Sequence, residues 1–263
     1  MKTVQEFKEY KQKKKLISMV TCYDHWSAKI VAKTDVDCLL VGDSVAMVVH
    51  GFSNTLQATT EMMALHTEAV FRAQTNKLIV TDLPFLAHRK GRSHMMNSVD
   101  KLMKAGASAL KIETAPGQEK EVQYISESGV PVIGHLGLTP QYVHQFGGFK
   151  MQGKSQEDGQ KILDHAKKLE QAGAHALVLE CIPQALAQAI TRSVQIPTIG
   201  IGAGLDVDGQ VLVLHDLLGF NSNFKPRFVR FFAEGEKWME SAVDQFSQAV
   251  ADKTFPNKEE SFL

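Results

Sequence analysis

The sequence contains few cysteines, and their spacing excludes several classes of protein. Cys22, Cys38 and Cys181 are the only three, and none belongs to a C-x-x-C pair. A sparse, odd-numbered set argues against a disulfide framework, so a reducing cytoplasm is the expected compartment. Cys181 could be interpreted as a catalytic nucleophile or, as is more common, as a small buried residue.

Long apolar runs and an excess of one charge are also absent. No run approaches the length of a membrane span, and residues 1–16 contain no apolar core of a signal peptide. Lysine plus arginine and aspartate plus glutamate each number 29, so the formal net charge is zero. We therefore expect neither nucleic acid nor a membrane as a partner. Lys11 and the lysines at 13–15 fit a basic patch or, as is much more common, a solvated helix face, which we expect here.

The sequence does contain a series of short apolar runs without strict polar alternation, which is typical of parallel strands covered on both sides. Hydrophobic residues make up 44% of the chain, enough for a sizeable core. The runs span residues 16–24, 37–44, 77–84, 109–113, 130–137, 176–180 and 196–204, with a weaker eighth at 210–216.

Helix-like segments separate these runs. Residues 60–74 and 155–172 carry amphipathic patterns, the second behind an expected N-cap at Ser155, and Pro183 opens a further segment. Eight strand–helix units in a chain of this length predict an α/β fold, a closed (β/α)8 TIM barrel with a parallel sheet. We expect a single domain over residues 1–263, with extra helices at the N- and C-terminal ends.

Two parts of the chain fit the barrel pattern less well. Between Gly204 and Gln210 there is no room for a crossover helix, which parallel strands ordinarily require. Either residues 208–218 are themselves partly helical or this unit is degenerate. The residues from Pro226 onward are predicted as closing helices.

The predicted strands end on polar residues. The segments KAGASALKIE (104–113) and QAGAHALVLE (171–180) nearly repeat, and both stop on glutamate. Strand C-termini in a barrel converge on one mouth, where active sites lie. Carboxylates gathered there repel one another unless a cation lies between them. The residues at these ends are Asp24, Asp43, Ser44, Asp82, Glu113, His135 and Glu180.

Asp43, Asp82 and Glu113 offer oxygen ligands from three successive strands. No histidine pair or cysteine accompanies them, and such a set favours Mg²⁺ or a similar hard ion over zinc. The alternative is that the two aspartates cap helices or turns.

Lys111 and Glu180 are the other candidate reactive groups. Lys111 lies two residues before Glu113, so both side chains face the same side of the strand. An inward lysine can bind an anionic substrate, form a Schiff base or simply pair with nearby acids. Glu180 suits a general base, although a fourth metal ligand or a helix cap would also explain it.

Two glycine-containing segments complete the candidates. Residues 200–204, GIGAG, lack the third glycine of a dinucleotide-binding fingerprint, so a Rossmann fold is rejected. Residues 137–154 form a long loop of the kind that often serves as a lid or binding loop.

Several segments match the motifs of a known family in the same order. They are LLVGDS, TDLPF, ALKIE, GHLGLTPQ, GGFKMQGK, LVLE, IPTIGIGAG and DGQVLV, together with HTEAVFRA and FPNKEESF. Jointly these motifs are specific, and over essentially its whole length the chain resembles the ketopantoate hydroxymethyltransferase family.

The resemblance implies a barrel related to the phosphoenolpyruvate mutase and isocitrate lyase group. It implies transfer of a hydroxymethyl unit from methylene-tetrahydrofolate to α-ketoisovalerate (3-methyl-2-oxobutanoate), which yields ketopantoate for pantothenate synthesis. Members of the family are cytoplasmic homo-oligomers, typically decamers, and act on a small keto acid and folate.

The resemblance also assigns roles to the strand-end residues. The metal ligands for Mg²⁺ are Asp43, Asp82 and Glu113, and the residues that contact the keto acid are Asp43, Ser44, Asp82 and Lys111. Glu180 is the general base, and His135 lies near the reacting groups. Magnesium would stabilise the enolate that forms when the C3 proton leaves.

Two segments depart from the family pattern, and three other functions compete with this assignment. Residues 88–97, HRKGRSHMMN, are unusually basic and leave the folate contacts open, and residues 55–60 replace a proline-containing turn. One rival is a carbon–carbon lyase or mutase of the same superfamily, which carries a KKCGH-type loop that this chain lacks. The others are a Schiff-base aldolase that uses Lys111 and a non-catalytic barrel that acts as a binding protein.

Overall fold

The structure is a computed structural model that describes residues 3–221 and 226–262. The chain forms two compact units, Met1–Val213 and Leu214–Leu263. The first unit contains the whole sheet, and the second contains two helices. A single domain over residues 1–263 therefore stays a prediction.

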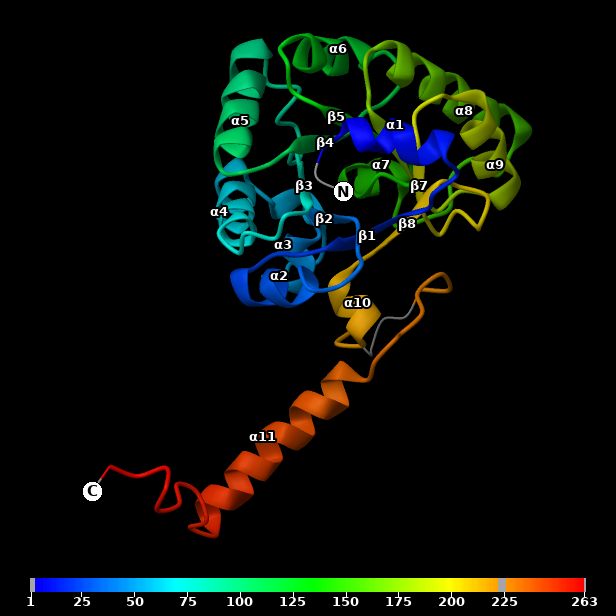
Figure 1. The fold of residues 1–263 in the computed structure, drawn as a ribbon. Coiled ribbons are helices and arrows are strands. Elements are labelled where there is room, and N and C mark those ends of the chain that lie inside the picture. Colours follow the sequence, from blue (N-terminus) through cyan, green and yellow to red (C-terminus); the bar gives the residue numbers. More distant parts are fainter. Residues whose placement is uncertain (1–2, 222–225, 263) are drawn as a thin grey trace. The chain divides into compact units, whose positions relative to one another are not determined.

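Eight parallel strands close into a barrel in the first unit (Figure 1). β1 pairs with β2 on one side and with β8 on the other, so the sheet has no free edge. The strands are β1 (Ile17–Thr21), β2 (Cys38–Val41), β3 (Leu78–Asp82), β4 (Ala109–Glu113), β5 (Val132–Gly137), β6 (Ala176–Glu180), β7 (Thr198–Ile201) and β8 (Gly209–Leu212). Each lies within or across its predicted run, which confirms the (β/α)8 barrel.

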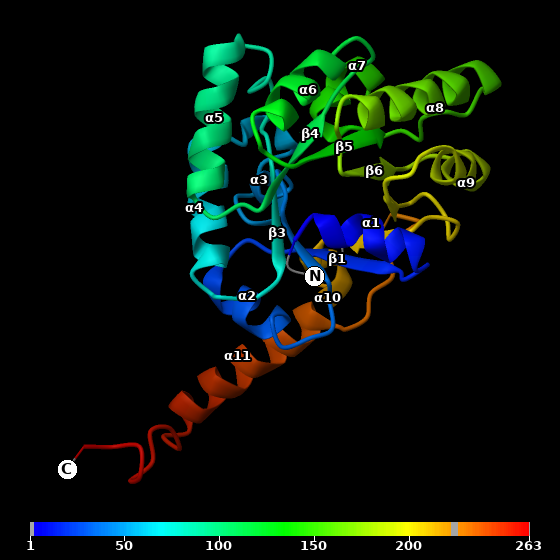
Figure 2. The ribbon, with the colours of Figure 1, turned by 45° about the horizontal axis from the view of Figure 1, so that its top comes forward.

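Helices follow most of the strands and cover the outside of the barrel, as two views of the ribbon show (Figures 1 and 2). In the first unit they are α1 (Gln5–Gln12), α2 (His25–Val31), α3 (Val45–Val48), α4 (Thr60–Phe71), α5 (Arg92–Lys104), α6 (Glu119–Glu127), α7 (Val143–Phe146), α8 (Gln156–Gln171) and α9 (Gln184–Ser193), with 3-10 turns η1 (Thr55–Gln57) and η2 (Pro140–Tyr142). Ser155 caps α8 as predicted, because its hydroxyl accepts a hydrogen bond from the backbone N–H of Asp158 at 3.1 Å.

The connection between β7 and β8 is the irregular part of the barrel. Residues 202–208 join the two strands without a helix, and β8 is followed at once by α10 (Leu214–Leu218). Both sequence alternatives therefore hold in part, since the unit lacks its crossover helix and the segment after β8 turns helical. A connection without a helix is possible here because the strands are short, so that a few extended residues reach from the end of β7 to the start of β8.

The barrel interior is filled by alternate residues of the strands. Pairs two positions apart, such as Leu78 with Val80 and Ala176 with Val178, point inward and form one buried cluster. Phe7 of α1 is fully buried in the same cluster. The interior is thus a packed core, and the same alternation determines which residues face the axis where the strands end.

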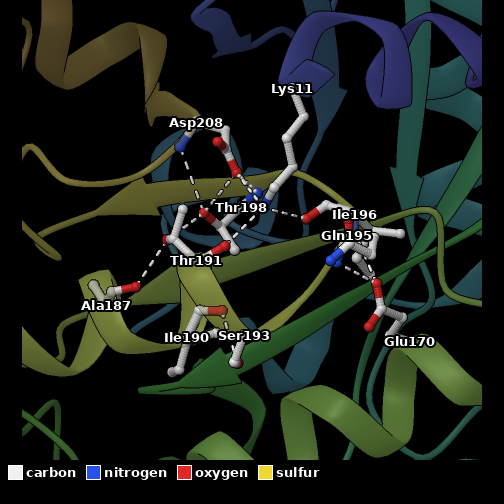
Figure 3. Close-up of polar contacts among 10 residues, drawn as sticks. All are labelled: Lys11, Glu170, Ala187, Ile190, Thr191, Ser193, Gln195, Ile196, Thr198 and Asp208. Atoms are coloured by element: carbon white, nitrogen blue, oxygen red, sulfur yellow. Dashed lines mark hydrogen bonds and ion pairs between the residues drawn. The ribbon is translucent and has the colours of Figure 1, made fainter. Parts of the chain in front are cut away.

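A polar network lies at the N-terminal ends of the strands (Figure 3). Lys11 of α1 donates hydrogen bonds to the carbonyl oxygens of Thr191 and Ile196 at 2.8 and 2.9 Å and to Asp208 Oδ2 at 3.0 Å. Asp208 Oδ2 also accepts from the backbone N–H of Thr198 at 2.9 Å. The prediction of a solvated Lys11 is wrong, because carbonyls and an acid far along the chain enclose its ammonium group.

The second unit contains α10 and α11 (Gly235–Ala251). Trp238 and Val243 lie on α11 as predicted, but residues 226–234 are not helical, so the prediction of helices from Pro226 is wrong for that part. A helix that began at Pro226 would place the positive charges of Arg227 and Arg230 near its N-terminus, which is unfavourable, whereas α11 has Glu236 in its first turn. Across the described part of the chain, no helix is both long enough and apolar enough to cross a membrane.

Candidate active site

The rows of alternate residues that fill the barrel interior end in polar side chains at the mouth. On β3 the row Leu78–Val80 continues to Asp82, and on β4 Ala109 is followed by Lys111 and Glu113. Register pairs Asp82 with Lys111 and Glu113 with His135, so these groups are neighbours across the sheet. All four are buried, at 5% exposure or less.

Asp43, Asp82 and Lys111 form one half of the site. The backbone N–H of Asp43 donates to Asp82 Oδ2 at 2.9 Å, and Lys111 Nζ lies 3.1 Å from Asp82 Oδ1. Neither aspartate caps a helix through its side chain. By contrast, Asp24 does cap α2, because its Oδ1 accepts from the backbone N–H of Ser27 at 2.8 Å. Of the predicted mouth residues, Asp24 therefore has a structural role.

His135 and Glu180 form the other half with Glu113. His135 Nδ1 lies 3.2 Å from Glu113 Oε1 and 3.1 Å from Lys111 Nζ, while its Nε2 lies 3.2 Å from Glu180 Oε2. The Glu180 side chain is 17% exposed, against 1% for that of Glu113, so Glu180 has more access to solvent. Glu180 does not cap α9, whose N-cap residue is Pro183 without a capping side chain.

Gln141 is a site residue that the sequence analysis did not single out. Its Nε2 donates to Asp43 Oδ2 at 2.9 Å and to the carbonyl of Leu83 at 3.0 Å, and its backbone N–H donates to Glu113 Oε2 at 2.9 Å. It belongs to η2, in the loop of residues 137–154 that was predicted to serve the site. Gln141 therefore connects the two predicted metal ligands Asp43 and Glu113.

Tyr23 is a second missed residue, and it holds Ser44. The Tyr23 hydroxyl lies 2.8 Å from Ser44 Oγ at the start of α3, next to Asp43. Tyr23 is buried at 1% exposure, and burial raises the pKa of its hydroxyl. It follows a strand as the aspartates do, but a tyrosine near the end of an apolar run carries no signal that separates it from the core.

The charges at the mouth are not balanced. Burial, together with repulsion from Asp82 and Glu113, raises the pKa of Asp43 well above its usual range. Burial raises the pKa of Glu113 to about 7, although Lys111 opposes this. Burial alone would lower the pKa of Lys111, but the three carboxylates raise it overall. One lysine is thus shared by three buried acids.

His135 is neutral in this surrounding. Burial and the nearby Lys111 lower its pKa, against the opposite effect of Glu180. If Lys111 donates to Nδ1, the ring carries its proton on Nε2, the nitrogen that faces Glu180. His135 can therefore orient the Glu180 carboxylate, which supports its predicted place near the reacting groups.

A divalent cation fits the excess of negative charge. The donors are carboxylate oxygens, and buried Asp82 Oδ1 accepts no hydrogen bond of regular geometry, although Lys111 Nζ lies 3.1 Å away as its ion-pair partner. Among residues 3–221 and 226–262, no three His, Cys, Asp or Glu side chains form a ready-made ligand cluster. Magnesium usually takes one or two carboxylates and completes its shell with water and substrate oxygens. The adjacent Asp43 and Asp82 suit such an open site.

The environment of Cys181 does not activate its thiol as a nucleophile. It lies directly after Glu180 and is half-buried. Burial raises the pKa of its thiol to about 12, with a further contribution from Glu180, so the reactive thiolate is not populated near neutral pH. All three cysteines are free thiols.

Comparisons with known proteins show which family the chain belongs to. The family model described as ketopantoate hydroxymethyltransferase matches residues 1–258. A 3-methyl-2-oxobutanoate hydroxymethyltransferase of Bdellovibrio bacteriovorus is 52% identical over 100% of both chains, and one of Coxiella burnetii is 50% identical over 97% of this chain and 96% of its own.

Solved structures share the fold at low identity. A phosphoenolpyruvate phosphomutase of Streptomyces platensis has a TM-score of 0.64 at 12% identity, covering 95% of this chain and 88% of that one. A phosphonopyruvate hydrolase in complex with oxalate and Mg²⁺ has a TM-score of 0.63 at 12% identity, covering 99% and 93%. These likenesses show the barrel fold, whereas the full-length sequence matches show the family: the chain belongs to the ketopantoate hydroxymethyltransferase family.

Proposed function

We propose that this protein transfers a hydroxymethyl group from methylene-tetrahydrofolate to 3-methyl-2-oxobutanoate and so forms ketopantoate. The observation that carries the proposal is the buried excess of carboxylates around Lys111 at the barrel mouth, with Glu180 beside it. The printed names of the full-length relatives support the same reaction.

The keto acid would bind where positive charge and oxygen ligands meet. Lys111, which its acidic neighbours keep protonated, neutralises the substrate carboxylate, and Ser44 adds a hydroxyl held by Tyr23. Asp43 and Asp82, with Glu113 behind them, would hold Mg²⁺. When bound, that ion would polarise the keto oxygen and make the proton at C3 more acidic.

Glu180 is the best placed general base. It is the carboxylate at the mouth with the most access to solvent, and His135 Nε2 lies 3.2 Å from it. It would take the C3 proton, and C3 would form a bond to the methylene carbon carried by the folate. Both carbon–nitrogen bonds of that carbon would break, water would supply the hydroxyl oxygen, and the C3 proton and one proton of the water would pass to the two nitrogens as tetrahydrofolate leaves. Because Lys111 is held in its protonated form, it is a poor amine nucleophile, which argues against the Schiff-base aldolase.

Proton exchange at C3 tests this function without folate. With Mg²⁺, the protein should introduce deuterium from D₂O at C3 of 3-methyl-2-oxobutanoate. Glu180→Gln should slow the exchange by about 10²–10⁴-fold, the usual contribution of a general base, while keto acid binding measured by calorimetry persists. Normal exchange in the variant, or a borohydride-trapped adduct on Lys111 in the wild type, would contradict the proposal.

Two further assignments belong to this proposal. We infer a homo-oligomer, with the decamer that the family resemblance implies as the expected form. We infer a cytoplasmic location because the three cysteines are free thiols. Sedimentation of the purified protein tests the first, since a monomer at micromolar concentration would contradict it.

A further inference from the structure

A cavity of about 320 Å³ lies between the loops that follow β3 and β4. We call it the rim cavity, because both loops leave strands at the catalytic end of the barrel. Its lining includes His88, Arg89, Arg92, Lys120 and Tyr124, with Gly91 and Gly117. The basic segment 88–97, which the proposed reaction does not use, contributes four of these seven residues.

The rim cavity carries unpaired positive charge. Arg89 forms an ion pair with Glu121 at 2.6 Å, and the guanidinium group of Arg92 lies 4.6 Å from the centre of the Tyr124 ring. Within residues 3–221 and 226–262, neither Arg92 nor Lys120 has a carboxylate at ion-pair distance. Two cations thus face the cavity without an acid of their own.

The backbone at the cavity is open to a ligand. Gly91 is the N-cap residue of α5, a helix of 13 residues, and no side chain caps that helix end. A Cβ atom built on Gly91 or on Gly117 would meet nothing within 4 Å, so no neighbouring side chain covers either glycine. Uncapped backbone N–H groups at a helix start favour negative charge.

A buried imidazole supplies independent evidence for a ligand. His88 lines the cavity and is only 5% exposed, and its Nδ1 has no hydrogen-bond partner. Its Nε2 lies 3.1 Å from Gln118 Oε1, so that nitrogen is already used. A buried polar atom without a partner is costly. Burial lowers the pKa of the ring, and the negative charge of a bound carboxylate would oppose that effect and favour a proton on Nδ1 that the carboxylate can accept.

Gln118 connects the rim cavity to the rest of the mouth. Its Oε1 also accepts from the hydroxyl of Tyr142 at 3.3 Å, and Tyr142 lines a neighbouring cavity of about 350 Å³ together with Phe146. Tyr142 directly follows Gln141, which contacts Asp43 and Glu113. An elongated ligand with an aromatic part near Tyr142 would therefore have an acidic end within reach of the rim cavity.

We propose that the rim cavity binds the glutamyl carboxylates of the folate co-substrate through Arg92, Lys120 and the start of α5. This inference rests on the proposed function, because it assumes a folate carrier at the mouth. Paired cations and helix N–H groups recognise a carboxylate tail, and they contribute to carrier binding rather than to the chemical step. A free anion such as phosphate shares this chemistry, so the test distinguishes the two sources.

The test compares two one-carbon carriers, methylene-tetrahydrofolate with a triglutamate tail and methylene-tetrahydropteroate, which has no glutamate. In the wild type, the KM for the carrier with the tail should be about tenfold lower or more, at similar kcat. In Arg92→Gln/Lys120→Gln this preference should shrink to about twofold. Deuterium exchange at C3 without folate should stay at the wild-type rate and shows that the barrel is intact.

Lys104→Gln is the matched control. It removes one positive charge at the far end of α5, where Lys104 pairs with Asp100 at 2.8 Å, and it should keep the full preference for the tail. An unchanged preference in the double variant, or no preference in the wild type, overturns the inference while the proposed function stands. If inorganic phosphate inhibits the reaction equally with both carriers, the cavity binds a free anion and not the glutamate tail, and the inference is overturned. If neither carrier yields product, both the proposed function and this inference are refuted.

Discussion

The two ends of the barrel contain polar networks of similar size but different charge balance. At the N-terminal end, one cation, Lys11, meets one carboxylate, Asp208, and two carbonyl groups, so each charge has partners (Figure 3). At the mouth, Asp43, Asp82 and Glu113 share Lys111, and repulsion raises the pKa of Asp43. A network whose charges balance stabilises the fold. A network with excess negative charge can bind a positively charged ligand.

The difference also separates stability from function. Removing one partner from a balanced network leaves a buried charge without its counter-charge, and this lowers the free energy of unfolding. Removing a carboxylate from the mouth relieves repulsion, so the protein without metal should become more stable while activity falls. Substitutions at the two ends should therefore change stability in opposite directions.

The largest effect is expected for Asp43→Asn at the mouth. Activity should fall by about 10²-fold or more, because a proposed metal ligand loses its charge. The free energy of unfolding of the metal-free protein should rise by about 1 kcal/mol, because a buried and repelled carboxylate is gone. Steady-state kinetics and urea unfolding measure the two quantities.

Asp24→Asn is the control for this substitution. Asp24 also follows a strand but caps α2, and asparagine caps helices about as well as aspartate. Activity and stability should both stay near the wild-type values. Equal losses of activity in the two variants would mean that the mouth does not depend on Asp43 in particular.

The next effect concerns the N-terminal end of the barrel. Lys11→Met should lower the free energy of unfolding by about 2–3 kcal/mol, because Asp208 and two carbonyl groups lose their donor. The C3 exchange rate should not change at temperatures where the variant is folded. Lys13→Met, at the C-cap of the same helix and in an exposed pair with Glu9, should change stability by less than about 0.5 kcal/mol.

A loss of exchange in folded Lys11→Met would contradict the division between the two ends. Equal destabilisation by Lys11→Met and Lys13→Met would likewise show that the enclosed network at Lys11 adds nothing. Chemical unfolding monitored by circular dichroism distinguishes these results.

The comparison also shows which features the sequence could predict. The strands at 109–113 and 176–180 coincide with their apolar runs, since a strand covered on both sides consists mainly of apolar residues. Their alternation then places Lys111 and Glu113 on one side. Acids at the mouth were predictable because charge at the end of such a run stands out.

Residues whose roles depend on distant partners were not predictable. Lys11 resembles its exposed neighbours in sequence, and its acceptor on Thr191 lies 180 residues away. Gln141 is a neutral amide in a loop, and only the path of that loop brings it to Asp43 and Glu113. Asp24 and Asp43 occupy similar positions after strands, and local backbone geometry alone decides which one caps a helix.

The smallest effect is a pH dependence that belongs to the mouth. The pKa of Glu113 is raised from 4.5 to about 7 in the folded state, so the folded protein binds a proton that the unfolded chain releases. This stabilisation is fully present below about pH 4.5 and is lost as the pH rises to about 7. The metal-free protein should melt a few degrees higher at pH 6 than at pH 8, a difference of about 1–2 kcal/mol.

Two controls assign this pH dependence to the mouth rather than to the protein as a whole. Glu113→Gln keeps a side-chain oxygen that can accept from the backbone N–H of Gln141 but cannot titrate, so its melting temperature should differ less between the two pH values. Magnesium should raise the wild-type melting temperature more at pH 8 than at pH 6, since proton and cation compete for the same carboxylates. Lys11→Met should keep the wild-type slope, because its network lies at the other end of the barrel and does not contact Glu113. An identical slope in wild type and Glu113→Gln would place the titrating group elsewhere and remove the electrostatic contrast between the two ends.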